Sequence, residues 1–216
     1  MTNWVKGIIW DWNGTLLDDT KLAVETMNGM LGKRNLQTLS VDQYKEVFTF
    51  PVKDYYEKIG FDFELEPFEI PAIEFIERYN RLVSDCNLHD DAIPVLEYLK
   101  YYHIRQFVVS AMQQEMLDQC MEHYDIGKYF EHVSGLDNHY ADSKVDNAKR
   151  MIADLQLNPE ELILIGDTIH DFEVASELGC KCILIANGHQ SRLVLQSTGT
   201  TIVDSLMQLK DHLLNL

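Results

Sequence analysis

The sequence predicts an α/β fold, in which a Rossmann-like parallel sheet core carries an inserted α-helical cap domain. Three observations lead to this prediction. Short apolar runs alternate with amphipathic stretches, the runs are apolar at successive residues, and one long helical block interrupts the alternation. A strand with apolar residues on both faces is buried on both faces, which is typical of a parallel sheet covered by helices.

The first expected strand is 5–10, an apolar run that ends just before Asp11. It is rich in β-branched and aromatic residues, which favours a buried strand. Similar runs predict further strands at 106–110, 162–167 and 181–186, with weaker signals at 132–135 and 200–203. Between these runs, helical periodicity predicts helices at 92–102, 114–123, 144–155, 172–179 and 205–214.

The segment between the first two expected strands has a different pattern. It contains no clear strand, and its helical periodicity predicts helices at 22–31, 41–48, 52–59 and 70–83. A block of this size can form a small domain. We therefore expect an α/β core of residues 1–16 and 88–216 and a helical cap of residues 17–87. Hinge motion of the cap would open and close the site between them.

Composition excludes several classes of partner. The chain of 216 residues has a formal net charge of −17, which argues against nucleic acid and anionic membrane as partners. No apolar run approaches the roughly 20 residues that cross a bilayer, and residues 1–6 lack a signal-peptide pattern, so we expect a cytoplasmic protein. The four cysteines have no metal-site spacing and are expected to be reduced thiols. No motif specifies an oligomeric state.

Polar residues follow three of the expected strands. Asp11, Ser110 and Asp167 each stand at a strand's carboxyl end, which is where parallel sheets bind their ligands. Asp171 lies one helical turn beyond Asp167. Magnesium is commonly held by one or two carboxylates together with water and phosphate oxygens. The sequence therefore predicts a magnesium site at this rim, and Gly14 fits a tight turn where backbone N–H groups approach an anion.

Four short motifs occur in a characteristic order. They are Asp11-Trp12-Asn13-Gly14-Thr15-Leu16, a strand ending in Ser110, Lys144 at the start of a helix, and Gly166-Asp167 with Asp171 four residues later. In this order they resemble the haloacid dehalogenase-like hydrolases, especially the phosphoglycolate phosphatase-like branch with a helical cap after the first motif. The resemblance covers essentially the whole chain, and the first and fourth motifs are the specific ones.

The resemblance implies a magnesium-dependent phosphatase acting in two steps. Asp11 would attack phosphorus to give an aspartyl-phosphate, which water then hydrolyses. Mg²⁺ would be held by Asp11, the backbone carbonyl of Asn13 and Asp167, with Asp171 in support. The phosphate would be bound by Gly14, Thr15, Ser110, Ala111 and Lys144. Lys144 would supply the positive charge that the acidic composition does not.

Asn13 departs from the family pattern. The resemblance places a second aspartate at this position, acting as general acid and base, and an amide cannot exchange a proton near neutral pH. General acid–base catalysis typically contributes about 10²–10⁴-fold. Three explanations stay open. The substrate has a good leaving group, such as an acyl or aryl phosphate or an activated carbon; another residue supplies the proton; or the chain is a natural or engineered low-activity form.

The predicted function is hydrolysis of a small phosphorylated metabolite. The alternatives are a low-activity or non-catalytic protein that binds such a metabolite, and a phosphonate hydrolase in which Lys53 of the cap forms a Schiff base. We expect Lys53 to be a surface or substrate-steering lysine. Asp18 and Asp19 lie just past the first motif, and His170 lies inside the fourth-motif loop; we expect solvated capping acids and a loop histidine.

Overall fold

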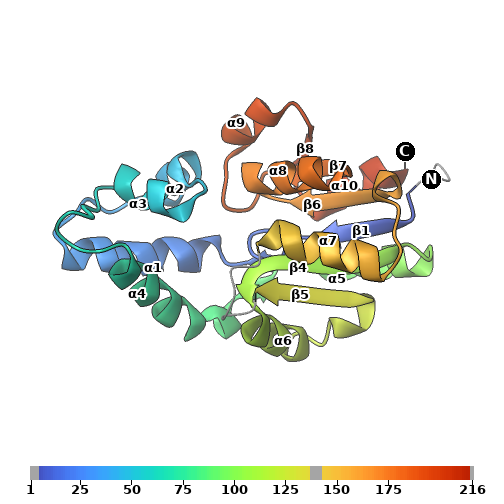
Figure 1. Cartoon of the computed structure of the whole chain (residues 1–216), viewed down its shortest axis with the longest axis horizontal. Helices are drawn as coiled ribbons and strands as arrows, with labels where there is room; N and C mark the ends of the chain where they lie inside the picture. Colours follow the sequence, from blue (N-terminus) through green and yellow to red (C-terminus); the bar gives the residue numbers. More distant parts are fainter. Residues whose placement is uncertain (1–4, 137–142, 215–216) are drawn as a thin grey trace.

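The sheet is six-stranded and entirely parallel. The computed structural model describes residues 5–136 and 143–214; residues 1–4, part of the expected core, lie outside these ranges. The strand order β5-β4-β1-β6-β7-β8 confirms the predicted fold class (Figure 1). The strands are β1 (Gly7–Trp10), β4 (Arg105–Gln113), β5 (His132–Leu136), β6 (Leu162–Gly166), β7 (Lys181–Ile185) and β8 (Thr201–Val203).

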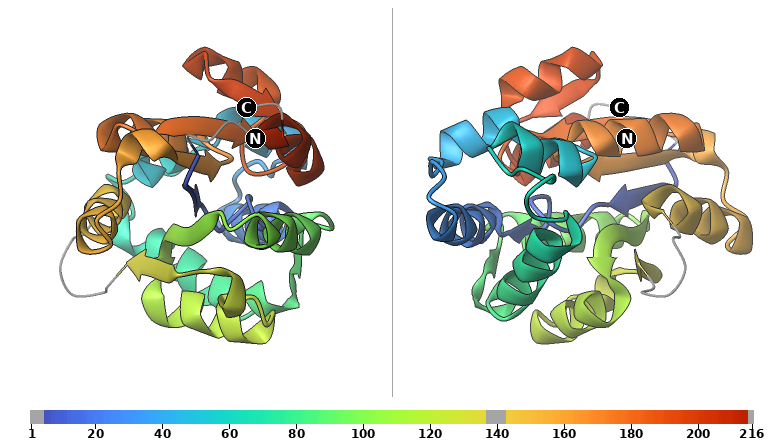
Figure 2. Two further views of the ribbon diagram at one scale, coloured as in Figure 1. Left: turned by 90° about the vertical axis from the view of Figure 1, so that its right-hand side faces the viewer. Right: turned by 60° about the vertical axis from the view of Figure 1, so that its left-hand side comes forward.

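Helices cover both faces of the sheet (Figures 1 and 2). They are α5 (Ala92–Tyr101), α6 (Gln114–His123), α7 (Lys144–Asp154), α8 (Ile169–Leu178), α9 (Arg192–Leu195) and α10 (Leu206–Leu214). Ile8 and Trp10 of β1 pack in one apolar cluster with α5, α6 and α10, whereas Ile9 packs in another with α7 and α8. Burial of successive residues on opposite faces explains the uninterrupted apolar pattern of β1.

Two elements differ from their expected bounds near the rim. β4 continues past Ser110 to Gln113, with a register shift relative to β5 after Val109. Helix α8 begins at Ile169, three residues before the expected start, because Thr168 and Asp171 form a capping box. The short helix α9 was not expected from the periodicity.

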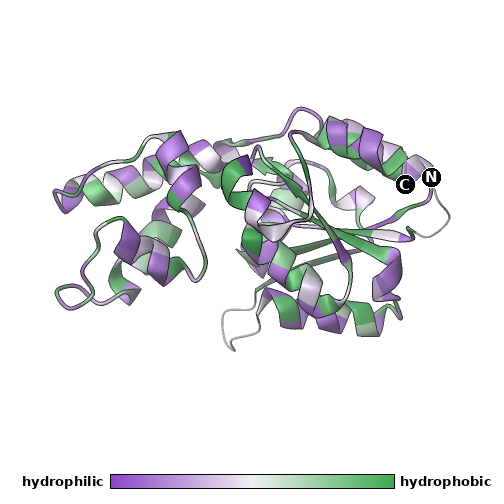
Figure 3. Cartoon of the chain, turned by 90° about the horizontal axis from the view of Figure 1, so that it is seen from above, coloured by the Kyte–Doolittle hydropathy of each residue, from purple (hydrophilic) through white to green (hydrophobic). Residues whose placement is uncertain are grey.

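The cap consists of α1 (Thr20–Lys33), α2 (Val41–Val47), α3 (Val52–Lys58), α4 (Glu69–Asn80) and the 3₁₀ turn η1 (Val83–Asp85). Its helices surround an apolar cluster of their own, and they lie beyond one end of the sheet (Figure 3). At its base, β2 (Leu17–Asp18) pairs antiparallel with β3 (Asn87–Leu88). These strands have only two residues each, too few for a periodic pattern to reveal. The division into core and cap domains at 17 and 87 stays a prediction.

The cap is docked on the core through α2. The Nζ atom of Lys45 donates to the carbonyl of Asn187 at 3.1 Å, and the amide of Gln190 donates to the carbonyl of Phe48 at 2.8 Å. Both core residues follow β7, so the loop after this strand connects the cap to the sheet rim. The expected hinge motion of the cap would have to break these contacts.

Candidate active site

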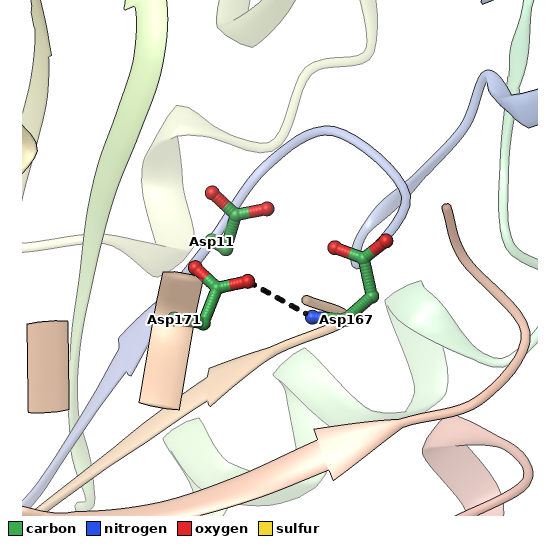
Figure 4. Close-up of side chains that lie close together, drawn as sticks. All are labelled: Asp11, Asp167 and Asp171. Carbon is green, nitrogen blue, oxygen red and sulfur yellow. Dashed lines mark hydrogen bonds between the residues drawn. The ribbon is translucent and has the colours of Figure 1, made fainter. Parts of the chain in front are cut away.

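Three buried carboxylates meet at the carboxyl ends of the central strands. Asp11 follows β1 and Asp167 follows β6, which is paired with β1, while Asp171 lies in the first turn of α8. One oxygen from each side chain lies within 4.8 Å of the others. Figure 4 shows the three side chains, with the backbone N–H of Asp167 donating to Asp171 at 3.2 Å. Such a cluster could hold a metal ion.

Lys144 is the cation in direct contact with this cluster. It is the first residue of α7, where Ser143 caps the helix in a capping box with Asp146. Its ammonium donates hydrogen bonds to the carboxylates of both Asp11 and Asp171. Burial alone would lower the pKa of Lys144, but the two carboxylates raise it overall, so the side chain stays charged.

The carboxylates carry more negative charge than Lys144 offsets. Burial raises the pKa of Asp11 to about 8 against the lowering effect of Lys144, and the charges of Asp171 and Asp167 add to the increase. Burial also raises the pKa of Asp167 to about 6. A divalent cation would stabilise the ionised forms of these groups. The all-oxygen donor set therefore fits a hard cation such as Mg²⁺.

Gly14 and Thr15 hold the first motif against Asp167. The hydroxyl of Thr15 donates to Asp167 at 3.1 Å. Gly14 has φ +72°, and a Cβ atom there would lie 2.3 Å from an Asp167 oxygen. Any other residue would therefore be strained and would displace the carboxylate. Gly14 N–H does approach an anion, as expected of this turn, but the anion is the carboxylate of Asp19 at 2.7 Å.

Ser110 lies apart from the carboxylate contacts. Its side chain is fully buried, and its hydroxyl accepts a hydrogen bond from the backbone N–H of Met112 at 3.0 Å. Ala111, the next residue, lines the cavity described below, whereas Ser110 does not. The structure thus brings Asp11, Lys144, Asp167 and Asp171 together, and the phosphate-binding role of Ser110 stays a prediction.

The side-chain amide of Asn13 is fully engaged within the protein. Its Nδ2 atom donates to Asp19 Oδ2 at 3.0 Å and to the hydroxyl of Tyr79, in the last turn of α4, at 2.7 Å. The amide nitrogen must face Asp19, because a carboxylate only accepts. An amide has two N–H bonds, and both are used. Asn13 therefore links the first motif to the cap and has no N–H left for a leaving group.

Asp19 corrects one of the sequence expectations. Asp18 is exposed, as expected, but Asp19 is 1% exposed and is not a solvated capping residue. Besides Gly14 and Asn13, it accepts a hydrogen bond of 2.5 Å from Tyr79 and contacts His189 Nε2 at 3.3 Å. Although burial opposes it, these partners lower the pKa of Asp19 overall. Its carboxylate is therefore ionised and fully coordinated by donors.

His189 is a site residue that the motifs did not identify. It lies four residues after β7, its backbone N–H donates to Asp167 at 2.5 Å, and its Nδ1 atom lies 3.0 Å from the hydroxyl of Tyr44 in α2. Burial favours neutral imidazole, but Asp19 dominates and raises the pKa of His189 to about 9. The strand-end rule could have found it, because β7 is adjacent to β6 at the same rim.

A cavity of about 550 Å³ extends from the carboxylates into the cap. Asp11, Asn13, Lys144, Asp167 and Asp171 line its core end. The cap end is lined mainly by aromatic side chains, among them Tyr44, Phe48, Tyr55, Phe68 and Phe75. Of the described residues that line it, Lys144 is the only lysine or arginine.

Two further expectations concern residues near this cavity. His170 is not merely a loop histidine: it lies in α8, lines the cavity, and stacks on Phe50 with ring centroids 4.7 Å apart. Lys53 is exposed, its ammonium lies 5.6 Å from the ring centroid of Phe63, and it does not line the cavity. This position does not favour the Schiff-base role.

Across the described ranges, no helix is both long and apolar enough to span a bilayer.

Comparisons with known proteins agree with this geometry. Residues 8–185 match the family described as haloacid dehalogenase-like hydrolase. The tyrosine-protein kinase PtkA of Mycobacterium tuberculosis is 24% identical, over 91% of this chain and 67% of its own length. Phosphoglycolate phosphatase 1 of Pseudomonas aeruginosa is 21% identical, over 94% and 77%. The structure of a predicted phosphatase from Clostridium acetobutylicum has a TM-score of 0.80 at 22% identity, covering 98% of this chain and all of that one.

The family match spans the first and fourth motifs, both of which reach the carboxylate cluster, and the fold of the structural relative includes the cap. The chain therefore belongs to the haloacid dehalogenase-like hydrolase family.

Proposed function

We propose that the protein is a magnesium-dependent phosphatase of a small phosphorylated metabolite and that Asp11 becomes transiently phosphorylated. The observation that carries this proposal is the position of Asp11. Its carboxylate lies at the core end of the cavity, is hydrogen-bonded by Lys144, and adjoins two further carboxylates. The relative named phosphoglycolate phosphatase 1 supports hydrolysis, and the one named tyrosine-protein kinase supports phosphoryl transfer more broadly.

Some residues of the site would hold or supply positive charge, and others fix the positions of the carboxylates. The Mg²⁺ ion would be held by Asp11, the carbonyl of Asn13 and Asp167, with Asp171 in support; when bound, it supplies positive charge that offsets the charge of the phosphoryl group. Lys144 keeps Asp11 oriented and adds a second positive charge beside the phosphate. Thr15 fixes Asp167, and the buried setting strengthens each of these interactions.

A non-catalytic or slowly turning-over phosphometabolite-binding protein is the second candidate, and Asn13 favours it. Both N–H bonds of its amide are used by Asp19 and Tyr79, so it can neither transfer a proton nor donate to the substrate. Attack by Asp11 does not need that proton when the leaving group is a weak base. Acetyl phosphate is therefore the substrate that separates the two candidates.

The test compares Asp11→Asn with the matched control Asp18→Asn, an exposed carboxylate near the same motif. Acetyl phosphate hydrolysis is measured with Mg²⁺ and with EDTA. For a phosphatase, we expect Mg²⁺-dependent turnover in the wild type and in Asp18→Asn, and a loss of about 10⁴-fold or more in Asp11→Asn. Turnover that persists in Asp11→Asn would refute the nucleophile. An inactive wild type whose melting temperature rises with Mg²⁺ would instead identify the binding protein.

A further inference from the structure

The cap end of the cavity has the chemistry of a binding site for an aromatic ring. Phe48 lies 5.3 Å from Tyr55 and 5.5 Å from His189 between ring centroids, and Tyr56 lies 5.6 Å from Phe68. All of these rings line one cavity that is continuous with Asp11. Such walls favour a flat apolar ligand group, through burial and through edge-to-face or offset ring contacts.

The same wall does not suit a leaving group with its own negative charge. Among the described residues that line the cavity, Lys144 supplies the only ammonium or guanidinium, and it is already bound to Asp11 and Asp171. A carboxylate such as that of phosphoglycolate would lose its hydration in the aromatic part, where the one charged ring, that of His189, is already paired with Asp19. Burial of an unpaired charge is costly, so the cap end selects against anionic leaving groups.

Asn13 independently restricts the leaving group. An alkoxide is about as basic as hydroxide, far more basic than a phenolate, and it departs slowly unless it is protonated. A phenolate, whose parent acid has a pKa of about 10, can depart without a proton. Because the Asn13 amide is committed to Asp19 and Tyr79, the site favours a leaving group of the second kind.

We propose that the preferred substrates are aryl phosphate monoesters, with the aryl ring seated against the cap aromatics and the phosphate on Asp11. This rests on the proposed function. The Asp11 carboxylate forms a bond to phosphorus as the bond between phosphorus and the aryl oxygen breaks. The electron pair leaves on the phenolate, which takes a proton from solvent. Water then attacks phosphorus as the bond between phosphorus and the Asp11 oxygen breaks, which releases inorganic phosphate, returns Asp11 to a carboxylate and gives a proton to solvent.

Tyr55 adds a further preference within this class. It lines the cavity and is 1% exposed, and its hydroxyl has no hydrogen-bond partner among the described residues. A buried hydroxyl without a partner is destabilising. An aryl phosphate with a polar group on the ring, away from the phosphate, would provide that partner and bind more tightly than plain phenyl phosphate.

Four phosphate compounds test separately whether the substrate needs an aromatic ring and whether it needs a good leaving group. Phenyl phosphate has a ring and a good leaving group, and benzyl phosphate has the ring with an alcohol leaving group. Acetyl phosphate has a good leaving group without a ring, and phosphoglycolate has neither. Because all the substrates form the same aspartyl-phosphate, kcat/KM reports departure of the leaving group. We expect kcat/KM for phenyl phosphate to exceed that for benzyl phosphate by about 10²-fold or more. Of phenyl and acetyl phosphate, which both have good leaving groups, we expect acetyl phosphate to have the higher KM.

The matched variants are Phe48→Leu, which removes a ring from the cavity wall, and Phe63→Leu, which removes a half-buried ring of the same cap that does not line the cavity. We expect Phe48→Leu to raise KM for phenyl and benzyl phosphate by about three- to tenfold, and to change KM for acetyl phosphate, which has no ring, by a smaller factor. Phe63→Leu should change none of them.

The outcomes distinguish this inference from the function on which it rests. A kcat/KM for benzyl phosphate within about tenfold of that for phenyl phosphate would refute the leaving-group requirement. Equal effects of Phe48→Leu on acetyl and phenyl phosphate, or a preference for phosphoglycolate, would refute the ring site while the phosphatase assignment stands. No turnover of any of the four, or turnover that survives Asp11→Asn, would refute the proposed function itself.

Discussion

The two ends of the cavity differ in how far their polar groups are paired within the protein. At the core end, every carboxylate has a donor: Asp11 and Asp171 share Lys144, and Asp167 is held by Thr15 and by the backbone of His189. At the cap end the walls are aromatic, and a buried hydroxyl, that of Tyr55, has no partner. The core end is ordered before a substrate arrives, whereas the cap end gains its contacts from the substrate. Chemistry and selectivity are therefore expected to respond to mutation independently.

The largest effect is expected at the buried cation. Lys144→Met leaves the carboxylates of Asp11 and Asp171 without their counter-charge, so the free energy of unfolding should fall by about 3–5 kcal/mol in EDTA at pH 8. The control is Lys149→Met on the same helix, whose ion pair with Glu177 is about half exposed and should contribute at most about 1 kcal/mol. Urea denaturation measures both. Equal losses in the two variants would contradict the difference between buried core charge and surface charge.

The variant His189→Gln tests the ion pair between His189 and Asp19, which lies between the core end and the cap end of the cavity. The pKa of His189 is raised to about 9, above the usual value near 6.5. Its stabilising contribution is therefore fully present below pH 6.5 and is lost as the pH rises through 9. The gap in unfolding free energy between wild type and variant should be constant at low pH and shrink by up to about 3 kcal/mol between these values. A gap that widens with pH in EDTA would show that His189 is neutral in the folded protein.

The sequence predicted the core end of the cavity better than it predicted the cap end. The apolar runs located the six strands, and the strand-end rule together with the motif order indicated the residues that meet at the core end. Asp19 was misjudged because its burial depends on Tyr79, 60 residues later, and on His189, 170 residues later. The sequence could not predict the aromatic lining of the cap end for a similar reason. Its aromatic residues have ordinary helical spacing, and only packing decides that Phe48 faces the cavity while Phe63 does not.

Asn13 lies where the core end of the cavity meets the cap, because its amide donates to both Asp19 and Tyr79. Two variants test whether this amide is structural. Asn13→Asp places a carboxylate 3.0 Å from that of Asp19 and removes the donor to Tyr79, which should lower stability by about 1–3 kcal/mol. Exchanging the two groups in Asn13→Asp/Asp19→Asn restores an amide–carboxylate pair and should recover part of the loss.

The same variants also test catalysis. Repulsion from Asp19 would raise the pKa of the new carboxyl group, so that it retains a proton to donate, and benzyl phosphate turnover should rise by about tenfold or more relative to phenyl phosphate. Chemical denaturation and the two rates are measured on the same preparations. An unchanged rate ratio in a folded Asn13→Asp protein would mean that position 13 does not limit departure of the alcohol.

The smallest effects are expected from two substitutions that each remove one tyrosine hydroxyl from the cap. Tyr44→Phe removes a hydroxyl that lies 3.0 Å from His189 Nδ1, and should lower the free energy of unfolding by about 1 kcal/mol. Tyr55→Phe removes a hydroxyl of similar burial that has no partner in the described structure, so the free protein should be as stable as the wild type or slightly more stable. Because both changes delete one oxygen from a buried tyrosine of the cap, opposite signs would show that the Tyr44 hydroxyl belongs to the ordered core network and that the Tyr55 hydroxyl is unpaired in the free protein. Equal losses in urea denaturation would instead mean that Tyr55 is satisfied within the protein, and the cap end would then be as fully ordered as the core.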